Sequence, residues 1–251
     1  MSTTIINKTI TMWASPKAQL SVPFAGPWEA YGSFGINAAT SVRNLISGKP
    51  AFSIIGSPAY GPNYIELTGA QVAYLATSIK NSEDMTIVAS VMPMNDASSA
   101  VVSNYQSQRA DGTGLCIGTQ LGFDINTPAD GNVQATFNHG VLVNGVSTGA
   151  RANTPDAPIN TWSLISGRVK NSARARTVNN LTTGTTGVNS PALNPADLGD
   201  FLRIGSAYNS QFGGVVRVCE VAILSGYLSD ADFALLVQRM RDSAAKKGIT
   251  V

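Results

Sequence analysis

Residues 201–248, FLRIGSAYNSQFGGVVRVCEVAILSGYLSDADFALLVQRMRDSAAKKG, form the stretch that decides the fold of this chain. Its middle, residues 215–224, is a run rich in β-forming residues, which predicts a β-strand. The run is too apolar to face water on either side, so it indicates a strand that is covered on both faces. The break Ser225-Gly226 ends it.

A helix is expected after this strand. Ser229 is placed to cap its N-terminus, and Asp230 and Asp232 put negative charge near the positive end of the helix dipole. Gly248 is placed to end it. Apolar residues recur at i, i+3, i+4 and i+7, which is one stripe of an amphipathic helix: Phe233, Leu236, Val237 and Met240. Such a strand and helix require a larger sheet, which the preceding 200 residues must supply.

Most of the remaining chain reads as short strands separated by turns. The expected strands cover residues 52–55, 63–67, 85–92, 100–106, 114–118, 133–137, 162–169 and 173–179. Asn144-Gly145, set between β-forming residues, is typical of a hairpin turn, and residues 181–198 are expected to form a long loop. The absence of a long alternation of strands and helices argues against a doubly wound nucleotide-binding sheet. The predicted fold class is all-β, an antiparallel β-sandwich with one C-terminal α-helix.

The composition excludes several classes of function. With 43% hydrophobic and 13% charged residues, the 251-residue chain can bury a core. A net charge of +2 gives no case for nucleic acid, and no apolar run approaches the roughly 20 residues that cross a membrane. Met1-Ser2-Thr3-Thr4 lacks the pattern of a secretory signal, which favours synthesis in a cytoplasm. Cys116 and Cys219 are expected to be buried free thiols.

Residues 1–41 differ from the rest of the chain. Ile5, Ile6 and Ile10 suggest a short strand. Further on, prolines, which disfavour regular helix, alternate with four aromatic residues: Phe24, Trp28, Tyr31 and Phe34. These aromatic side chains either pack on the chain's own body or belong to an arm that docks on a neighbouring subunit. We therefore expect an N-terminal extended arm or assembly segment, residues 1–41, and a main domain, residues 42–251.

A characteristic order of features runs through residues 42–245 and is most specific in the C-terminal third. It consists of Asn44 to Gly48 leading to Gly56-Ser57-Pro58, the strand 85–92, Trp162 before Ser163-Leu164-Ile165, Leu202-Arg203-Ile204-Gly205, Phe212-Gly213-Gly214, Glu220-Val221-Ala222-Ile223 and Leu228-Ser229-Asp230-Ala231-Asp232. In this order the chain resembles the concanavalin A-like, laminin-G-type jelly roll. It is similar in particular to versions found in bacteriophage virion proteins, which often sit on tails or capsids and contact host glycans.

The resemblance implies a non-enzymatic virion structural protein, tail-associated or capsid-decorating, that is made in the host cytoplasm. Its expected partners are other virion proteins and further copies of itself, with host-surface carbohydrate as a candidate ligand. Because this scaffold also supports lectins, hydrolases and structural modules, two alternatives remain. One is a purely architectural subunit with no ligand, and the other is a glycan-cleaving hydrolase with dispersed acidic residues.

No motif for catalysis is found. Hydrolytic members of the resembled family carry Glu-x-Asp-x-Glu or Glu-x-Asp-x-x-Glu on one strand, and no such motif includes Glu29, Glu66, Glu83 or Glu220. Asp111, Asp124 and Asp130 could form a catalytic pair of carboxyl groups only if the fold brings them together in space. His139, the single histidine, cannot form a zinc site of two or three histidines and is expected to be an exposed loop residue. We therefore expect no enzyme activity.

Calcium is the ion that the resemblance implies most often. Asp111-Gly112-Thr113 and Asp124-Ile125-Asn126 contain oxygen ligands of the kind that calcium prefers. Asp and Asn beside Gly more often form turns. Turns are therefore the expected structure, and no cofactor is assigned.

Loop tyrosines with polar neighbours are the candidate carbohydrate-binding residues. One group is Tyr105 with Arg109 and Asp111, beside Asn104, and the other is Tyr208 with Asn209, beside Gln211. The alternative is that these tyrosines pack locally, whereas Trp162 is expected in the core. Four basic residues occupy even-numbered positions of the hairpin 162–179 and could therefore lie on one face: Arg168, Lys170, Arg174 and Arg176. An anionic sugar or a lipid phosphate could bind to such a face. The alternative is a face that is simply solvated.

Overall fold

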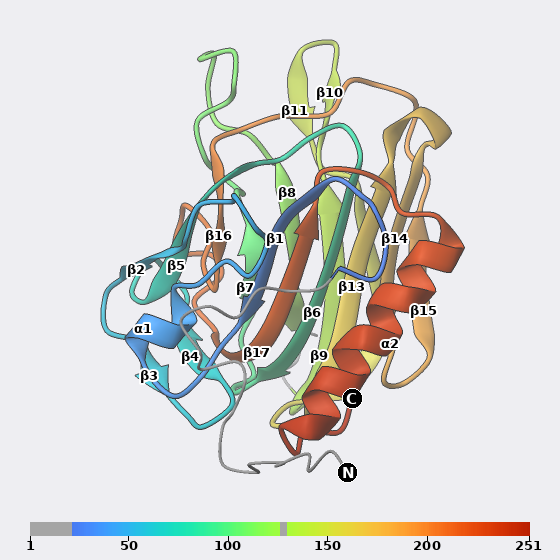
Figure 1. The fold of residues 1–251 in the computed structure, drawn as a ribbon. Coiled ribbons are helices and arrows are strands. Elements are labelled where there is room, and N and C mark those ends of the chain that lie inside the picture. The colour runs from blue at the N-terminus through green and yellow to red at the C-terminus, as the bar shows by residue number, and fades with distance from the viewer. Residues whose placement is uncertain (1–21, 126–129) are drawn as a thin grey trace, which may run out of the picture.

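Strand β17, Val215–Leu224, lies inside an eight-stranded antiparallel sheet, with β6 on one side and β4 and β1 sharing the other (Figure 1). The computed structural model describes residues 22–125 and 130–251 and confirms the predicted fold class. The strand order is β15-β14-β13-β6-β17-β4-β3, with β1 paired to β17. The strands are β1 Trp28–Ser33, β3 Ala59–Tyr60, β4 Ile65–Thr68, β6 Met85–Pro93, β13 Ser163–Lys170, β14 Ala175–Asn180, β15 Thr185–Asn189 and β17.

A seven-stranded antiparallel sheet packs against the first, in the order β12-β9-β8-β7-β16-β5-β2. Its strands are β2 Ser53–Ile55, β5 Tyr74–Lys80, β7 Ser99–Ser103, β8 Thr119–Ile125, β9 Asn132–His139, β12 Arg151–Pro158 and β16 Phe201–Ile204. A separate hairpin joins β10, Val141–Val143, to β11, Val146–Thr148. Its turn residues Asn144 and Gly145 have φ values of 51° and 80°, as the Asn-Gly pair predicts.

The main core fills the space between the two sheets. Val221 and Ile223 of β17 point into it, together with Leu121 and Phe137 from the seven-stranded sheet. The alternate residues of β17 belong to a second apolar cluster on the outer side of the eight-stranded sheet. The strand is therefore apolar on both faces because both faces are covered, as its sequence predicts.

Helix α2, Asp230–Lys246, provides that outer cover (Figure 1). The Asp232 N–H donates to Ser229 Oγ at 3.1 Å, so Ser229 caps the helix as predicted, and Gly248 follows it with a φ of +73°. Leu236, Val237 and Met240 are buried against the sheet. Within residues 22–125 and 130–251, no helix is long and apolar enough to cross a membrane.

The described part of the N-terminal segment belongs to the sandwich. Strand β1 pairs with residues 220–224 of β17, and the short helix α1, Ala38–Ser41, follows it. The aromatic side chains pack on the chain's own body: Trp28, Tyr31 and Phe34 are buried, and Phe24 stacks on Trp28. The boundary expected at residue 41 needs correction, since residues 28–33 are a strand of the main sheet. The strand expected at Ile5, Ile6 and Ile10 lies outside the described residues.

Other predictions about strands were wrong. Residues 114–118 are irregular, because Gly114 and Gly118 have φ values of +142° and +59°, and β8 starts directly after them. Strand β15 lies within the expected long loop 181–198, since it pairs with β14 along its whole length. Strands β5, β8 and β12 were not predicted.

The two cysteines are buried free thiols, as expected. Cys219 lies on β17, and burial raises its pKa to about 12 although Lys247 Nζ is 3.5 Å from the sulfur. Burial also raises the pKa of Cys116. Trp162, expected in the core, is only half-buried and packs against Tyr64, with ring centroids 6.1 Å apart.

Candidate functional site

The outer face of the seven-stranded sheet carries polar side chains. Strand β9 shows this by its alternation: Val133, Ala135 and Phe137 belong to the core, whereas Thr136 and Asn138 line a surface depression. Successive residues of a strand point to opposite faces, so this alternation exposes one polar face. Helix α2 covers the outer face of the other sheet (Figure 1).

The strand register aligns five polar side chains in a row across this face. Arg151 on β12 lies opposite Asn138 on β9, and Asn138 lies opposite Gln120 on β8. Gln120 is opposite Ser103 on β7, which is opposite Arg203 on β16. Residues directly opposite each other share a face of the sheet. The row therefore brings together positions that are up to 100 residues apart in the sequence.

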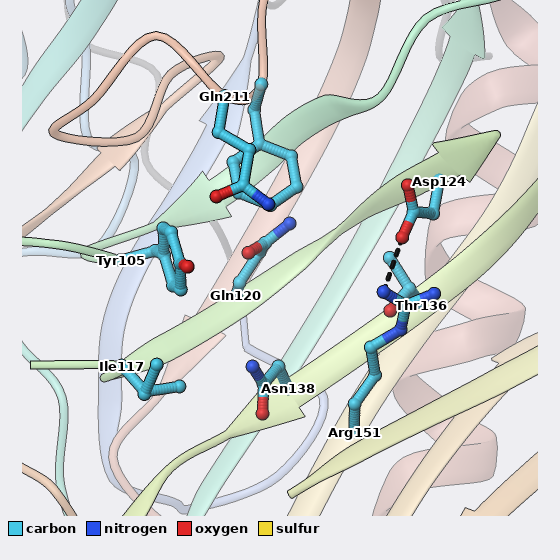
Figure 2. Close-up of a pocket in the computed structure, with 9 residues that line it drawn as sticks. Tyr105, Ile117, Gln120, Asp124, Thr136, Asn138, Arg151 and Gln211 are labelled. Carbon is cyan, nitrogen blue, oxygen red and sulfur yellow. Dashed lines mark ion pairs between the residues drawn. The ribbon is translucent and has the colours of Figure 1, made fainter. Parts of the chain in front are cut away.

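A depression of about 120 Å³ opens on the part of the row nearest β12 (Figure 2). Side chains from three strands and from two loops line it: Tyr105, Ile117, Gln120, Asp124, Thr136, Asn138, Arg151, Gln211 and Phe212. It is smaller than the roughly 300–1,000 Å³ of a typical small-molecule pocket. Its size therefore suits one ring-sized group lying on the surface.

Three polar groups in the depression have hydrogen-bonding capacity to spare. Thr136 Oγ1 is buried and has no partner among the described residues. The Gln120 side chain likewise makes no hydrogen bond to a described residue. Asn138 Oδ1 accepts from the Ala150 N–H at 2.9 Å, which leaves its Nδ2 group to face the depression. An unpartnered buried polar group costs about 1–3 kcal/mol, so a hydroxyl-bearing ligand would recover part of that cost.

An ion pair borders the depression on one side. Arg151 Nη1 lies 2.5 Å from Asp124 Oδ2, and Ser98 Oγ donates to the other carboxylate oxygen. Arg151 Nε donates to Asn153 Oδ1 at 2.7 Å. The Arg151 side chain is 44% exposed, so the pair contributes little to stability and mainly holds both groups in place.

Aromatic residues form the opposite side. The rings of Tyr105 and Phe212 meet edge to face, with centroids 5.4 Å apart. The Tyr208 N–H donates to the Tyr105 carbonyl at 3.0 Å, which ties the loop after β7 to the loop after β16. The two loops that the sequence singled out therefore lie side by side. Of the five predicted site residues Tyr105 lines the depression, as does Gln211, the polar neighbour of Tyr208.

Arg109 and Asp111 lie outside the depression. Arg109 Nη2 is 2.6 Å from Asp111 Oδ2, its Nη1 donates to the Gly145 carbonyl at 2.9 Å, and its Nε is 3.8 Å from the buried Asp197. Asp111 closes a turn: it accepts from the Thr113 N–H and hydroxyl, and the backbone hydrogen bond is the main reason that its pKa is lowered. Both residues thus serve the local structure.

Tyr208 and Asn209 lie beside the depression. The Tyr208 hydroxyl donates to the Phe201 carbonyl at 2.8 Å, and its ring covers the Arg203 guanidinium at 3.4 Å. Burial raises the pKa of Tyr208. Asn209 Oδ1 accepts from the Gln211 N–H at 3.3 Å. Local packing, the alternative stated for these loop tyrosines, describes Tyr208 well.

The expected basic face on the hairpin 162–179 does not form. Arg168 pairs with Asp230 at 2.9 Å on the α2 side, whereas Arg176 is fully buried and donates to Asn171 Oδ1. Arg176 lies opposite Val169 and not opposite Arg168. The parity argument failed because a 3₁₀ turn, Asn171–Ala173, and a left-handed Arg174 interrupt the two strands.

The prediction of an exposed loop histidine was also wrong. His139 ends β9 and is fully buried, with Nδ1 2.8 Å from Thr119 Oγ1. Burial, with a smaller contribution from the Arg176 charge, lowers its pKa to about 3. The imidazole is therefore neutral at ordinary pH. Its Nε2 has no partner among the described residues.

The acidic residues are dispersed. Glu29, Glu66 and Glu220 each pair with a different base, namely Lys49, Arg217 and Lys247. Of the suggested calcium ligands, Asp111 is in a turn, Asp124 is paired with Arg151, and Asn126 lies outside the described residues. In residues 22–125 and 130–251, no group of three or more His, Cys, Asp or Glu side chains is placed to hold a metal ion.

Gln120, Thr136 and Asn138 were not predicted as site residues. The signal that could have found two of them is the strict alternation in residues 132–138, NVQATFN, which marks one polar face. Gln120 had no such signal, because β8 was not predicted and its neighbours Gly122 and Gly118 obscure the pattern. The row itself depends on the register of strands that are distant in sequence.

Comparison with solved structures shows what this fold is similar to. The receptor-binding domain of a botulinum neurotoxin C/D mosaic superposes with a TM-score of 0.57 at 10% identity, over 84% of this chain and 51% of that one. Trypanosoma rangeli sialidase in complex with sialic acid gives a TM-score of 0.55 at 14% identity, over 85% of this chain and 33% of that one. The chain thus spans about half and about a third of these proteins.

These similarities show a shared concanavalin A-like sandwich. The identities are too low to say more than that about the chain. No protein-family model matches the sequence, and no curated protein is significantly similar to it.

Proposed function

We propose that the protein is a non-enzymatic carbohydrate-binding module that takes one sugar residue into the depression on the seven-stranded sheet. The observation that carries this proposal is the combination in one place of Thr136, Gln120 and Asn138, which have unused hydrogen-bonding groups, with the aromatic pair Tyr105 and Phe212. The hydroxyl groups of a sugar can bond to the polar side chains, and the apolar face of its ring can pack on the aromatic pair.

The shape of the site supports weak binding. The depression is small, and its polar groups come from strands that are already in place. Weak sites gain strength when several copies of a module act together. We therefore propose that the protein acts as a homo-oligomer or on a repetitive surface.

Two of the similar structures agree with this class of ligand. The sialidase structure contains sialic acid, and a botulinum neurotoxin serotype D ligand-binding domain, with a TM-score of 0.52 at 10% identity, is in complex with N-acetylneuraminic acid. Both ligands are sugars, which supports carbohydrate as the class of ligand and leaves its identity open to experiment.

A glycan array tests the proposal, with Gln120→Ala as the site variant. Gln120 is buried and has no hydrogen bond to a described residue, so its truncation should cost only the lost packing of the side chain and should weaken binding about tenfold. Gln238→Ala, on the exposed face of α2, is the matched control and should bind like the native protein. Absence of binding to every glycan, or equal binding by both variants, would refute this site.

The rival activity is glycan cleavage. We propose that none occurs, because the paired acids of a glycosidase are about 5–10 Å apart across an open site, and each of Glu29, Glu66 and Glu220 is paired with its own base elsewhere. Release of reducing ends from a polysaccharide that binds on the array would overturn this part of the proposal.

We further propose that the protein is a bacteriophage virion component, tail-associated or capsid-decorating. This rests on the resemblance described for residues 42–245 and on the low charge of the chain. The structural similarities reported above do not bear on it. Locating the protein in purified particles by mass spectrometry and immunogold labelling tests it, and a particle without the protein would refute it.

A further inference from the structure

The row of polar residues continues past the depression to Arg203, on β16. Gln120 and Arg203 are two strands apart, which at about 4.8 Å per strand places them about 10 Å from each other. This separation matches two linked sugar rings, so a ligand seated in the depression can reach Arg203 with its next residue or the one after.

The Arg203 guanidinium lies close to two tyrosine rings. Its central carbon lies 3.4 Å from the Tyr208 ring centroid and 4.6 Å from that of Tyr74. Nη1 donates to the Ala207 carbonyl and to Gln71 Oε1, both at 3.1 Å. The Tyr208 side chain also interacts with the guanidinium by a hydrogen bond, and the Arg203 side chain is partly exposed. A guanidinium that is fixed in place and still reaches solvent is a group that binds a carboxylate.

A strained turn helps to hold this arrangement. Ala70 and Gln71 have φ values of +52° and +65°, in the left-handed region that non-glycine residues seldom adopt. The Gln71 N–H donates to Ser206 Oγ at 3.0 Å, and its side chain accepts from Arg203. Strain of this kind persists only where the surroundings enforce it, and it is often found at ligand sites.

A second cation and an exposed aromatic ring lie next to Arg203. Lys80 Nζ is 5.3 Å from the centroid of Phe201, and Phe201 is 42% exposed. Both residues are opposite each other on β5 and β16, on the same face as Arg203. Asp200 acts electrostatically on the neighbouring Tyr208, and its one negative charge is outweighed by the two positive charges of Arg203 and Lys80. The patch formed by Arg203, Lys80 and Phe201 therefore offers both a cation and an apolar platform.

We infer that this patch is a second subsite that binds the carboxylate of an acidic sugar, and that the full ligand is an acidic oligosaccharide with one residue in the depression. This inference rests on the proposed function and narrows its ligand class. Arg203 would bind the carboxylate through its exposed N–H groups, and Phe201 would support the ring.

The test uses a panel of polysaccharides that contain hexuronic or nonulosonic acids, each paired with its carboxyl-reduced, neutral form. We expect the native protein to bind at least one acidic form about tenfold more tightly than its reduced partner, as one charge-assisted hydrogen-bonded pair allows. Arg203→Gln should abolish this preference and leave binding of the reduced form unchanged. Arg174→Gln, which removes the same charge at an exposed site in the turn between β13 and β14, should keep the preference.

The possible failures are distinct. Equal binding of acidic and reduced forms, or a preference that survives Arg203→Gln, overturns the second subsite and leaves the carbohydrate proposal standing. Binding of neither form by the native protein overturns both. Competition by poly-glutamate as strong as that by the acidic saccharide would show a non-specific anion patch and would also overturn the subsite.

Discussion

The Thr136 hydroxyl is better suited to binding a ligand than to stabilising the fold. Its hydroxyl is buried without a partner among the described residues, whereas the hydroxyl of Thr119, on the neighbouring strand, contacts His139 Nδ1 at 2.8 Å. The first hydroxyl costs stability and the second contributes to it. The two threonines thus form a matched pair for experiment.

Thr136→Val should leave the free energy of unfolding unchanged or raise it by up to about 1 kcal/mol, because it removes an unpartnered buried hydroxyl. The same change should weaken carbohydrate binding. Urea denaturation and array binding measure the two effects. Thr119→Val, the control, should destabilise by about 1 kcal/mol or more. If Thr136→Val destabilises the protein as much as Thr119→Val does, the Thr136 hydroxyl must have a hydrogen-bond partner.

His139 makes stability depend on pH. Its pKa in the folded protein, about 3, is below the ordinary value of 6.5, so the unfolded chain takes up a proton first as the pH falls. Stability present above pH 6.5 should therefore be lost progressively between pH 6.5 and pH 3, by about 2 kcal/mol from pH 7 to pH 5. Urea denaturation of the native protein and of His139→Gln checks this. Between pH 7 and pH 5 the native protein should lose about that much more unfolding free energy than His139→Gln. Equal losses in the two proteins would contradict the burial of His139.

At the scale of elements, buried charges fix the segments that lack regular structure or lie outside the sheets. Asp197 is fully buried and receives the Ile117 N–H at 2.6 Å and the Ser147 hydroxyl, with Arg109 nearby. These contacts connect the loop before β16, the loop before β8 and the hairpin β10–β11. Arg109 was predicted as a ligand-binding residue, and its place in this network explains its position instead.

Arg109→Ala should destabilise the protein by about 2–3 kcal/mol, because it leaves the buried Asp197 carboxylate without its nearest base. Its affinity for a glycan should stay unchanged, since Arg109 does not line the depression. Asp111→Ala, which removes an exposed partner, should cost much less than Arg109→Ala. Thermal unfolding and array binding measure these effects. If the Arg109→Ala variant is stable but no longer binds the glycan, Arg109 belongs to the ligand site.

Helix α2 and β17 are joined through Glu220. This carboxylate is fully buried and accepts from the Tyr31 hydroxyl at 2.8 Å and from the Ser243 hydroxyl, while Lys247 Nζ lies 2.7 Å away. Burial, followed by the Glu220 charge, raises the pKa of Tyr31. The cluster connects β1, β17 and the end of α2.

Lys247→Met should destabilise by about 3–5 kcal/mol, since it leaves a buried carboxylate unpaired. The double variant Glu220→Gln/Lys247→Met should recover much of this loss, because a neutral amide keeps hydrogen bonds to Tyr31 and Ser243 without a charge. A double-mutant cycle from urea denaturation measures the coupling. Additive losses would show that the two charges do not interact.

At the scale of the whole molecule, local patterns predicted the fold and long-range register produced the site. The strand 215–224 and the helix after Ser229 were predictable because composition, period and capping agree within one short stretch. The Asn144-Gly145 turn was predictable for the same reason. Each of these depends on neighbours in sequence alone.

The candidate site could not be predicted in that way. Gln120, Asn138 and Arg203 come together only because β7, β8, β9 and β16 pair in one register. The burial of His139 likewise depends on the position of β9 between its neighbours. Tyr105 was predicted because loop tyrosines beside polar residues are a local signal, and it lines the depression, whereas the same signal also selected Tyr208, which packs locally.

A titration of isotope-labelled protein with a glycan that binds on the array tests most directly whether the open face of the seven-stranded sheet binds carbohydrate. The side-chain amide signals of Gln120 and Asn138 report on the depression. We expect both signals to shift and to saturate with one common dissociation constant. Shifts confined to residues 109–113 or to α2, with the Gln120 and Asn138 amides unmoved at saturation, would contradict the proposed site.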